Sequence, residues 1–194
     1  GRDATLSVGG DVKFGITSNL TLSATINPDF GQVEADPSVF NLTAQETFFP
    51  ERRPFFTEGS NIFGFPIGFN GPGETLFYTR RIGRSPQRGL DGEYSDVPGN
   101  TTILGAAKVS GRTPGGWSVG FMDALTAEER GRTLADGDIT GHTVEPLTNY
   151  GVARAMRDFR NGSSRIGASV TSTHRRLDGD PGLAFLADQA YAGG

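Results

Sequence analysis

The sequence predicts an all-β fold built of antiparallel up-and-down hairpins, and three observations lead to it. Apolar and polar residues alternate over several segments of about eight to ten residues, which is the side-chain period of a β-strand. These segments come in pairs joined by short polar turns. Gly 29 among 194 residues suits a chain with many tight turns. The sequence has no uninterrupted apolar run of about 18 residues, so it does not predict a transmembrane helix.

The first predicted hairpin lies in residues 12–26. Apolar side chains occupy every second position on both sides of the short break Ser18-Asn19, at Val12, Phe14, Ile16, Leu20, Leu22, Ala24 and Ile26. The residues between them are lysine, glycine, serine, threonine and asparagine. One face of this hairpin is therefore expected to be apolar and the other polar.

Two further hairpins follow the same rule. The second turns at residues 114–116, and its predicted apolar face consists of Ile103, Gly105, Ala107, Val109, Trp117, Val119 and Phe121. In the third, Asn161-Gly162 predicts a type I′ turn. On its first strand Tyr150, Val152 and Met156 share a face that Arg154 interrupts, and Ile166, Ala168 and Val170 follow on the second strand. The three hairpins predict six strands in all.

The connections between the hairpins are long, whereas the turns within them are short. They run from Pro28 to about Gly99, from Thr126 to about Thr148, and from His174 onward. Short turns that alternate with long loops are typical of outer-membrane β-barrels, where polar partners line the lumen and aromatic residues such as Trp117 and Tyr150 would form interfacial girdles. Alternation alone does not distinguish this fold from a water-soluble β-sandwich with one polar face.

Residues 28–84, within the first long connection of residues 28–99, are rich in aromatic and charged residues. Nine phenylalanines fall between Phe40 and Phe77. Because each buried phenylalanine contributes roughly 1.5–3 kcal/mol, we expect this segment to fold against the sheet as a plug-like loop. The alternative is an aromatic platform for a ligand such as a sugar. The candidate ligand-binding residues are Phe48, Phe49, Arg52, Arg53, Phe55, Phe56, Arg80 and Arg81.

Carboxylates in the same segment raise two questions of chemistry. Asp29, Glu34 and Asp36 are weak candidates for binding a hard cation such as calcium. Two Asp-Gly-Asp sequences elsewhere, at residues 136–138 and 178–180, raise the same possibility but are better explained as ordinary turns. Glu46, Glu51 and Glu58 are weak candidates for the carboxyl pair of a glycoside hydrolase. Ion pairing with the neighbouring arginines explains them better, so we predict neither a metal site nor a catalytic residue.

The composition excludes several classes of function. The formal charge is -4 and the pI about 5.2, so the chain offers no basic face for nucleic acid. Cysteine is absent, which excludes disulfides, thiol catalysis and zinc-thiolate sites. Glycine-rich phosphate-binding motifs are absent as well, and we expect no cofactor.

Four motifs carry a resemblance to a known family. They are residues 12–22 (VKFGITSNLTL), 27–37 (NPDFGQVEADP), 46–59 (ETFFPERRPFFTEG) and 76–84 (LFYTRRIGR). The sequence resembles a family of outer-membrane proteins of Gram-negative bacteria without an assigned function. Its members usually carry an N-terminal domain like the family 9 carbohydrate-binding module, followed by a large barrel. The resemblance is dense over residues 11–84 and looser from about 100 to 175.

The resemblance implies a surface-exposed barrel at the bacterial outer membrane, and it supplies no catalytic residues. Barrels of this kind have at least eight strands, an even number, so six strands indicate part of a larger barrel. We therefore expect the chain to be a partial barrel in contact with outer-membrane lipid, which binds or passes a solute such as an oligosaccharide. The alternatives are a carbohydrate-active enzyme that hydrolyses O-glycosidic bonds and a soluble β-sandwich that binds carbohydrate.

Overall fold

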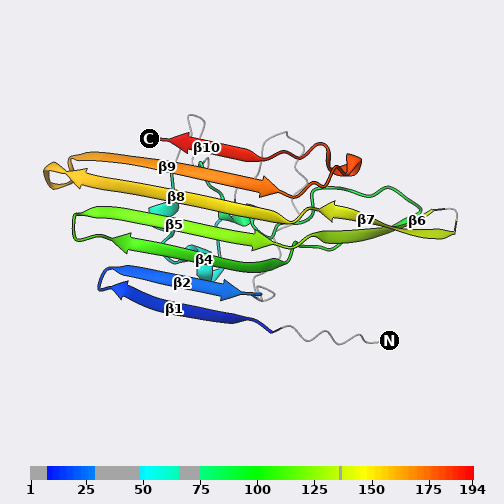
Figure 1. The fold of residues 1–194 in the computed structure, drawn as a ribbon, viewed down its shortest axis with the longest axis horizontal. Helices are drawn as coiled ribbons and strands as arrows, with labels where there is room; N and C mark the ends of the chain where they lie inside the picture. Colours follow the sequence, from blue (N-terminus) through cyan, green and yellow to red (C-terminus); the bar gives the residue numbers. More distant parts are fainter. Residues whose placement is uncertain (1–7, 29–48, 66–74, 136) are drawn as a thin grey trace.

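The computed structural model describes residues 8–28, 49–65, 75–135 and 137–194. Its centre is a seven-stranded sheet in which all neighbours are antiparallel, with the order β1-β2-β4-β5-β8-β9-β10 (Figure 1). The strands are β1 (Gly10–Thr17), β2 (Leu20–Ile26), β4 (Ile103–Arg112), β5 (Trp117–Thr126), β8 (Thr148–Phe159), β9 (Ser164–Arg175) and β10 (Gln189–Gly193). In the described part of the chain the sheet is open, with β1 and β10 at its edges. The predicted all-β, antiparallel class is confirmed.

The three predicted hairpins are present as β1–β2, β4–β5 and β8–β9. Their turns all lie at the same end of the sheet, on the left in Figure 1. The third turn differs from the expected two-residue form, because Phe159 pairs with Ser164 and leaves four residues between the strands. Arg160 and Asn161 both have positive φ, at 50° and 57°, and form the short 3-10 turn η2 (Arg160–Gly162).

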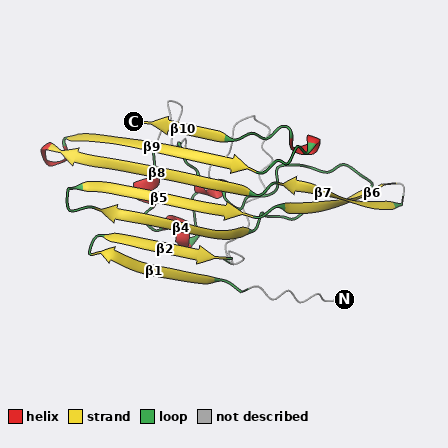
Figure 2. Cartoon of the chain, viewed as in Figure 1, coloured by secondary structure: helices red, strands yellow, loops and turns green. Residues whose placement is uncertain are grey.

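The connection expected between residues 126 and 148 is not an irregular loop. Residues 129–145 form the hairpin of β6 (Glu129–Ala135) and β7 (Asp138–Glu145), which extends the β5–β8 pair beyond the end of the main sheet (Figure 2). The short strand β3 (Tyr94–Asp96) pairs with β6 and completes a three-stranded sheet. After β9, the chain passes through η3 (Pro181–Leu183) and returns as β10, a strand that the sequence did not predict.

The register gives the seven-stranded sheet two chemically different faces. One row of paired residues crosses all seven strands and is apolar throughout: Phe14, Leu22, Val109, Phe121, Ala153, Val170 and Ala192. The adjacent row lies on the opposite face, and five of its seven side chains carry a polar group: Lys13, Ser23, Lys108, Met122, Val152, Thr171 and Tyr191. We call these the apolar face and the polar face.

Two parts of the chain between β2 and β4, residues 49–65 and 75–84, pack on the polar face, and we call them the packed segment. It contains the short helices α1 (Pro54–Thr57) and α2 (Ser60–Phe63) and the 3-10 turn η1 (Thr79–Arg81), which lie behind the sheet in Figure 1. The buried core between segment and sheet consists of Phe56, Phe63, Ile82, Ile103, Ala106, Met122, Ala124, Tyr150 and Val152. None of the helices in the described residues is long and apolar enough to cross a membrane.

Two of the predicted faces are wrong. Tyr150, Val152 and Met156 do share a face, but the pairing of Val152 with Met122 places them on the polar face, against the packed segment. Tyr150 is therefore buried in the core and does not lie in an exposed aromatic girdle. Ile103 also faces this core, because the register of β4 shifts between Ile103 and Gly105 and separates it from the apolar row.

Gly120 in β5 provides a test of this packing. A Cβ atom at this position would lie 2.7 Å from Ile62 and 2.8 Å from Phe63, both in α2. We expect Gly120→Val to destabilise the protein by about 1–3 kcal/mol, the usual cost of overpacking, and to make residues 49–65 more sensitive to protease. Gly99→Val is the control, because nothing lies within 4 Å of its Cβ position. Equal free energies of unfolding for the two variants would contradict the packing of α2 on β5.

Candidate functional site

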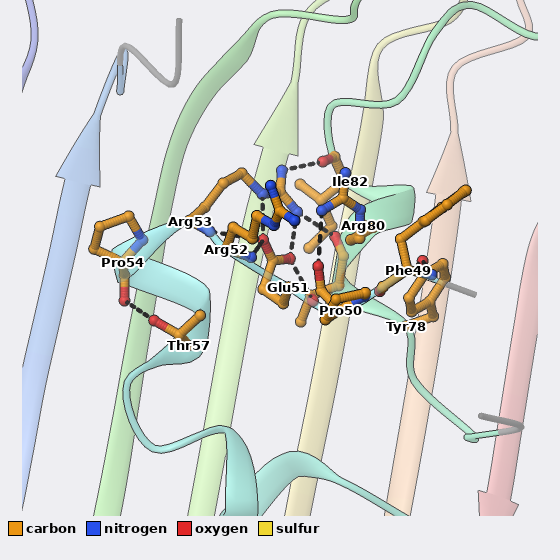
Figure 3. A network of polar contacts seen from close by, with 11 residues as sticks. Phe49, Pro50, Glu51, Arg52, Arg53, Pro54, Thr57, Tyr78, Arg80 and Ile82 are labelled. Atoms are coloured by element: carbon orange, nitrogen blue, oxygen red, sulfur yellow. Dashed lines mark hydrogen bonds and ion pairs between the residues drawn. The ribbon is translucent and has the colours of Figure 1, made fainter. Parts of the chain in front are cut away.

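The carboxylate of Glu51 joins the two halves of the packed segment (Figure 3). Its Oε1 accepts hydrogen bonds from the backbone N–H of Arg52 and Arg53, each at 3.0 Å, and from Arg53 Nε at 2.8 Å. Its Oε2 accepts from Arg53 Nη2 at 2.7 Å and from the Thr79 hydroxyl at 2.6 Å. The Arg53 guanidinium donates onward to the backbone oxygens of Ile82, at 2.6 Å, and Thr79, at 2.9 Å. Residues 51–53 and 79–82 are thus held together by hydrogen bonds from a largely buried ion pair.

Three further contacts strengthen this junction. The Tyr78 hydroxyl accepts a hydrogen bond from the Phe49 N–H at 2.8 Å and donates to the Phe49 carbonyl at 3.1 Å. Arg80 Nη1 donates to the Pro50 carbonyl at 2.9 Å, and the Arg53 guanidinium lies 4.2 Å from the centre of the Phe56 ring. The side chains of Tyr78 and Arg80 thus provide hydrogen-bond partners for backbone groups of Phe49 and Pro50, which lie outside any helix or strand.

The junction changes the ionisation of Glu51. Burial alone raises the pKa of this carboxyl, but the hydrogen bonds and charge of Arg53, with the hydrogen bond from Thr79, outweigh burial and lower it. A general acid at neutral pH needs a raised pKa and an unoccupied oxygen. Glu51 has neither, so its geometry suits an anchor and not a catalyst.

Both lysines of the chain attach the segment to the sheet. Lys108 of β4 is 1% exposed, and its Nζ donates to the backbone oxygens of Phe55 and of Glu58, the latter at 2.5 Å. The same ammonium lies 4.8 Å from the centre of the Phe55 ring. Lys13 of β1 forms an exposed ion pair with Glu58, and the hydrogen bond from Lys13 lowers the pKa of that carboxyl.

A cleft of about 510 Å³ lies between the packed segment, the polar face of β8, β9 and β10, and residues 185–187. Three arginines line it: Arg81, Arg84 and Arg175. The lining also includes five aromatic residues, namely Phe77, Tyr78, Tyr150, Phe185 and Tyr191, and the polar residues Gln87, Thr171, Thr173 and Gln189. No carboxylate is among the lining residues in the described part of the chain. This cleft is the candidate binding site.

The positive charges gather around one hydroxyl in the cleft. Arg84, Arg175 and Arg81 are all near enough to Tyr150 for their charges to act on its hydroxyl, as does the carboxylate of Glu145. Glu145 is itself buried outside the cleft, where its oxygens accept hydrogen bonds from Gln87 N at 2.8 Å and Gln87 Nε2 at 2.9 Å. Among the described lining residues, only the three arginines carry a full charge, and it is positive.

The predicted ligand-binding residues separate in the structure. Arg81 lines the cleft, whereas Phe49, Arg53 and Arg80 form the junction described above. Arg52 contributes its backbone N–H to Glu51, Phe56 belongs to the buried core, and Phe55 packs against that core. Phe48 lies outside the described residues, as do Glu46 and the metal candidates Asp29, Glu34 and Asp36.

The remaining acidic candidates have partners. Glu58 pairs with Lys13, Asp178 pairs with Arg176 at 2.8 Å, and Asp180 accepts a hydrogen bond from the N–H of Gly182 at the start of η3. Within residues 8–28, 49–65, 75–135 and 137–194, no three acidic or histidine side chains gather in a way that would hold a metal ion.

Sequence reasoning missed most of the cleft. Arg84 closes the motif of residues 76–84 and could have been grouped with Arg80 and Arg81 on that basis. Arg175 and Tyr191 had no such indication, because they come from β9 and from a strand that was not predicted.

Replacing Glu51 tests the junction. Glu51→Gln removes the charge of one partner of a largely buried ion pair, so we expect a loss of about 1–3 kcal/mol in the free energy of unfolding. Because the folded state lowers the pKa of Glu51, its stabilisation is present above the ordinary pKa of 4.5 and disappears as the pH falls through the lowered value. Urea unfolding of both proteins between pH 7 and strong acid checks this, with the exposed Glu93→Gln as control. A wild-type advantage that persists unchanged in strong acid would contradict the assignment.

Substitutions of the two lysines are expected to destabilise the protein to different extents. Lys108→Met leaves buried carbonyl groups without a donor, which costs about 1–3 kcal/mol. Lys13→Met breaks an exposed ion pair and is expected to cost about 0–1 kcal/mol. Thermal unfolding of the two variants under the same conditions measures the difference, and equal destabilisation would show that Lys108 does not anchor the segment.

The comparisons with known proteins agree with the absence of an assigned function. No curated protein and no solved structure matches the chain. Residues 1–180 match the family described as "Domain of unknown function (DUF5916)". This confirms the expectation of a family without an assigned function, and the chain belongs to that family.

Proposed function

We propose that the seven-stranded sheet is part of the wall of a bacterial outer-membrane β-barrel, with its apolar face toward lipid and residues 49–65 and 75–84 as part of a plug on the lumen side. The protein then binds or passes a solute such as an oligosaccharide, which enters at the cleft. The proposal rests on one observation above all, the apolar row that crosses every strand of the sheet.

The exposure of the apolar face favours lipid as its partner. Phe14, Phe121 and Val170 belong to the row and are 62%, 53% and 52% exposed. Soluble monomers rarely expose contiguous apolar patches of more than a few hundred Å². A β-sandwich would cover this face with a second sheet, but in the described residues the three-stranded sheet instead continues from the ends of β5 and β8. Lipid solvates such a face without a covering layer.

Strand length and the ends of the strands agree with this arrangement. β4 and β5 have 10 residues and β8 and β9 have 12, against about 9–11 for a tilted strand that spans a bilayer. Trp117 and Phe159 lie at the short-turn end, and the Arg157 guanidinium lies 5.9 Å and 5.1 Å from their ring centres. Aromatic residues of this kind mark the membrane interface in barrels.

The same comparison suggests an orientation. Outer-membrane barrels have short periplasmic turns and long extracellular loops. The turns β1–β2, β4–β5 and β8–β9 are short, and the long connections and the β6–β7 hairpin lie at the other end (Figure 1). Thr173 and Arg175 at the end of β9 line the cleft, so the cleft lies toward the proposed extracellular side.

A charged substitution on the apolar face tests the proposal. In a bilayer, Phe121→Arg is expected to cost about 2–4 kcal/mol and to reduce the folded fraction in detergent or lipid. Ile139→Arg is the control, because Ile139 is 74% exposed but lies in β7, outside the seven-stranded sheet. Circular dichroism and light scattering of the chain with and without detergent provide the measurement. If both variants fold equally well, and the chain is a monomer without detergent, the membrane proposal is wrong.

A further inference from the structure

Two of the cleft arginines have side-chain donors without a hydrogen-bond partner, a property that they share with Arg154, which lies outside the cleft. The Nε atoms of Arg84 and Arg175 are buried and have no hydrogen-bond partner. Among the ion pairs of the described residues, none involves Arg84 or Arg175. By contrast, Arg53, Arg88, Arg165 and Arg176 all pair with carboxylates.

The charge of Arg175 helps to lower the pKa of Asp188, but no acidic group in the described residues forms a direct ion pair with Arg84 or Arg175. Glu145 is engaged by both nitrogens of Gln87. Asp188 accepts a hydrogen bond from the Arg175 backbone N–H at 2.6 Å and lies 3.5 Å from His174 Nδ1. Arg175 also donates from Nη1 to the Ala187 carbonyl, which holds its side chain at the cleft. The guanidinium groups of Arg84 and Arg175, with Arg81 in the same lining, therefore favour an anion in the cleft.

The rest of the lining favours an anion that is also a carbohydrate. Tyr191, Phe77 and Phe185 offer flat apolar surfaces on which the C–H face of a sugar ring can pack. Thr171, Thr173 and Gln189 offer hydroxyl and amide groups that match sugar hydroxyls. A volume of about 510 Å³ falls in the usual range of small-molecule sites, roughly 300–1,000 Å³. A bare phosphate would use the arginines and leave most of this surface without a partner.

We infer that the cleft binds an acidic oligosaccharide, whose sugar carboxylates pair with Arg84 and Arg175 while its rings pack on the aromatic residues. The planar guanidinium group matches a carboxylate with two parallel hydrogen bonds. This inference rests on the proposed function and narrows its solute from oligosaccharides in general to those that carry uronate residues.

Calorimetry with the full chain in detergent tests the inference, with a galacturonate trisaccharide and the uncharged galactose trisaccharide of the same linkage as probes. We expect the galacturonate to bind at least roughly tenfold more tightly, and Arg84→Gln to weaken its binding by a similar factor. Arg84→Lys keeps the charge but loses the paired geometry, so an intermediate affinity is expected. Arg176→Gln is the matched control, since Arg176 follows Arg175 but is 62% exposed and pairs with Asp178.

A salt titration of the unchanged chain gives a test that does not depend on a variant's folding. Binding of the galacturonate should weaken as ionic strength rises, whereas binding of the neutral sugar should not. Inorganic phosphate serves as a third probe, and equal affinity for phosphate and galacturonate would overturn the assignment to carbohydrate.

The other outcomes separate this inference from the proposed function. If both trisaccharides bind equally, and Arg84→Gln has no effect, the acidic specificity is wrong and oligosaccharide binding remains. If neither sugar binds to a chain that folds only in detergent, the inference and the oligosaccharide role both fail, while the membrane assignment stands. If the chain folds without detergent and still binds galacturonate, the inference stands and the membrane assignment fails.

Discussion

The alternation of side chains across a β-sheet is the constraint on which the rest of this structure depends. Because successive residues point to opposite faces, strands that alternate apolar and polar residues around their centres form a sheet with one largely apolar face, although Asp123 and Arg157 also lie on that face. The pairing register carries the row from Phe14 to Ala192 across all the strands without a charged residue. A shift of one residue in any strand would exchange its two faces, so the register is strongly determined wherever one face is covered.

The packed segment, residues 49–65 and 75–84, covers part of the polar face with both apolar and polar contacts. Its phenylalanines form a core with the few apolar residues of that face, such as Met122 and Val152. The buried ion pair of Glu51 and Arg53 closes the segment on itself, and Lys108 attaches it to the sheet through backbone carbonyls. A buried ammonium is costly unless it has hydrogen-bond acceptors. Lys108 and the segment therefore depend on each other.

The same division of faces relates architecture to function. The apolar face has no cover in the described residues, and lipid would supply one. The polar face carries the segment and, beside it, the cleft with three arginines and five aromatic residues. In the proposed arrangement, the barrel wall, the plug and the solute site would all follow from one amphipathic sheet. Membership of a family without an assigned function leaves both the membrane role and the acidic ligand as proposals that the experiments above can decide.

The sequence by itself determined the local structure. The alternating segments predicted the three hairpins and their turns, because the two-residue period of a strand depends only on residues that are neighbours along the chain. Even so, Ile103 and Tyr150 were assigned to the wrong environment, since a shift in register and the position of the packed segment decide which face is covered. The hairpin β6–β7 and the strand β10 were not predicted, because their alternation of apolar and polar residues is weak. Only the tertiary structure brought Arg84, Arg175 and Tyr191 into one cleft, because their side chains come from segments that meet through strand order and packing rather than through sequence spacing.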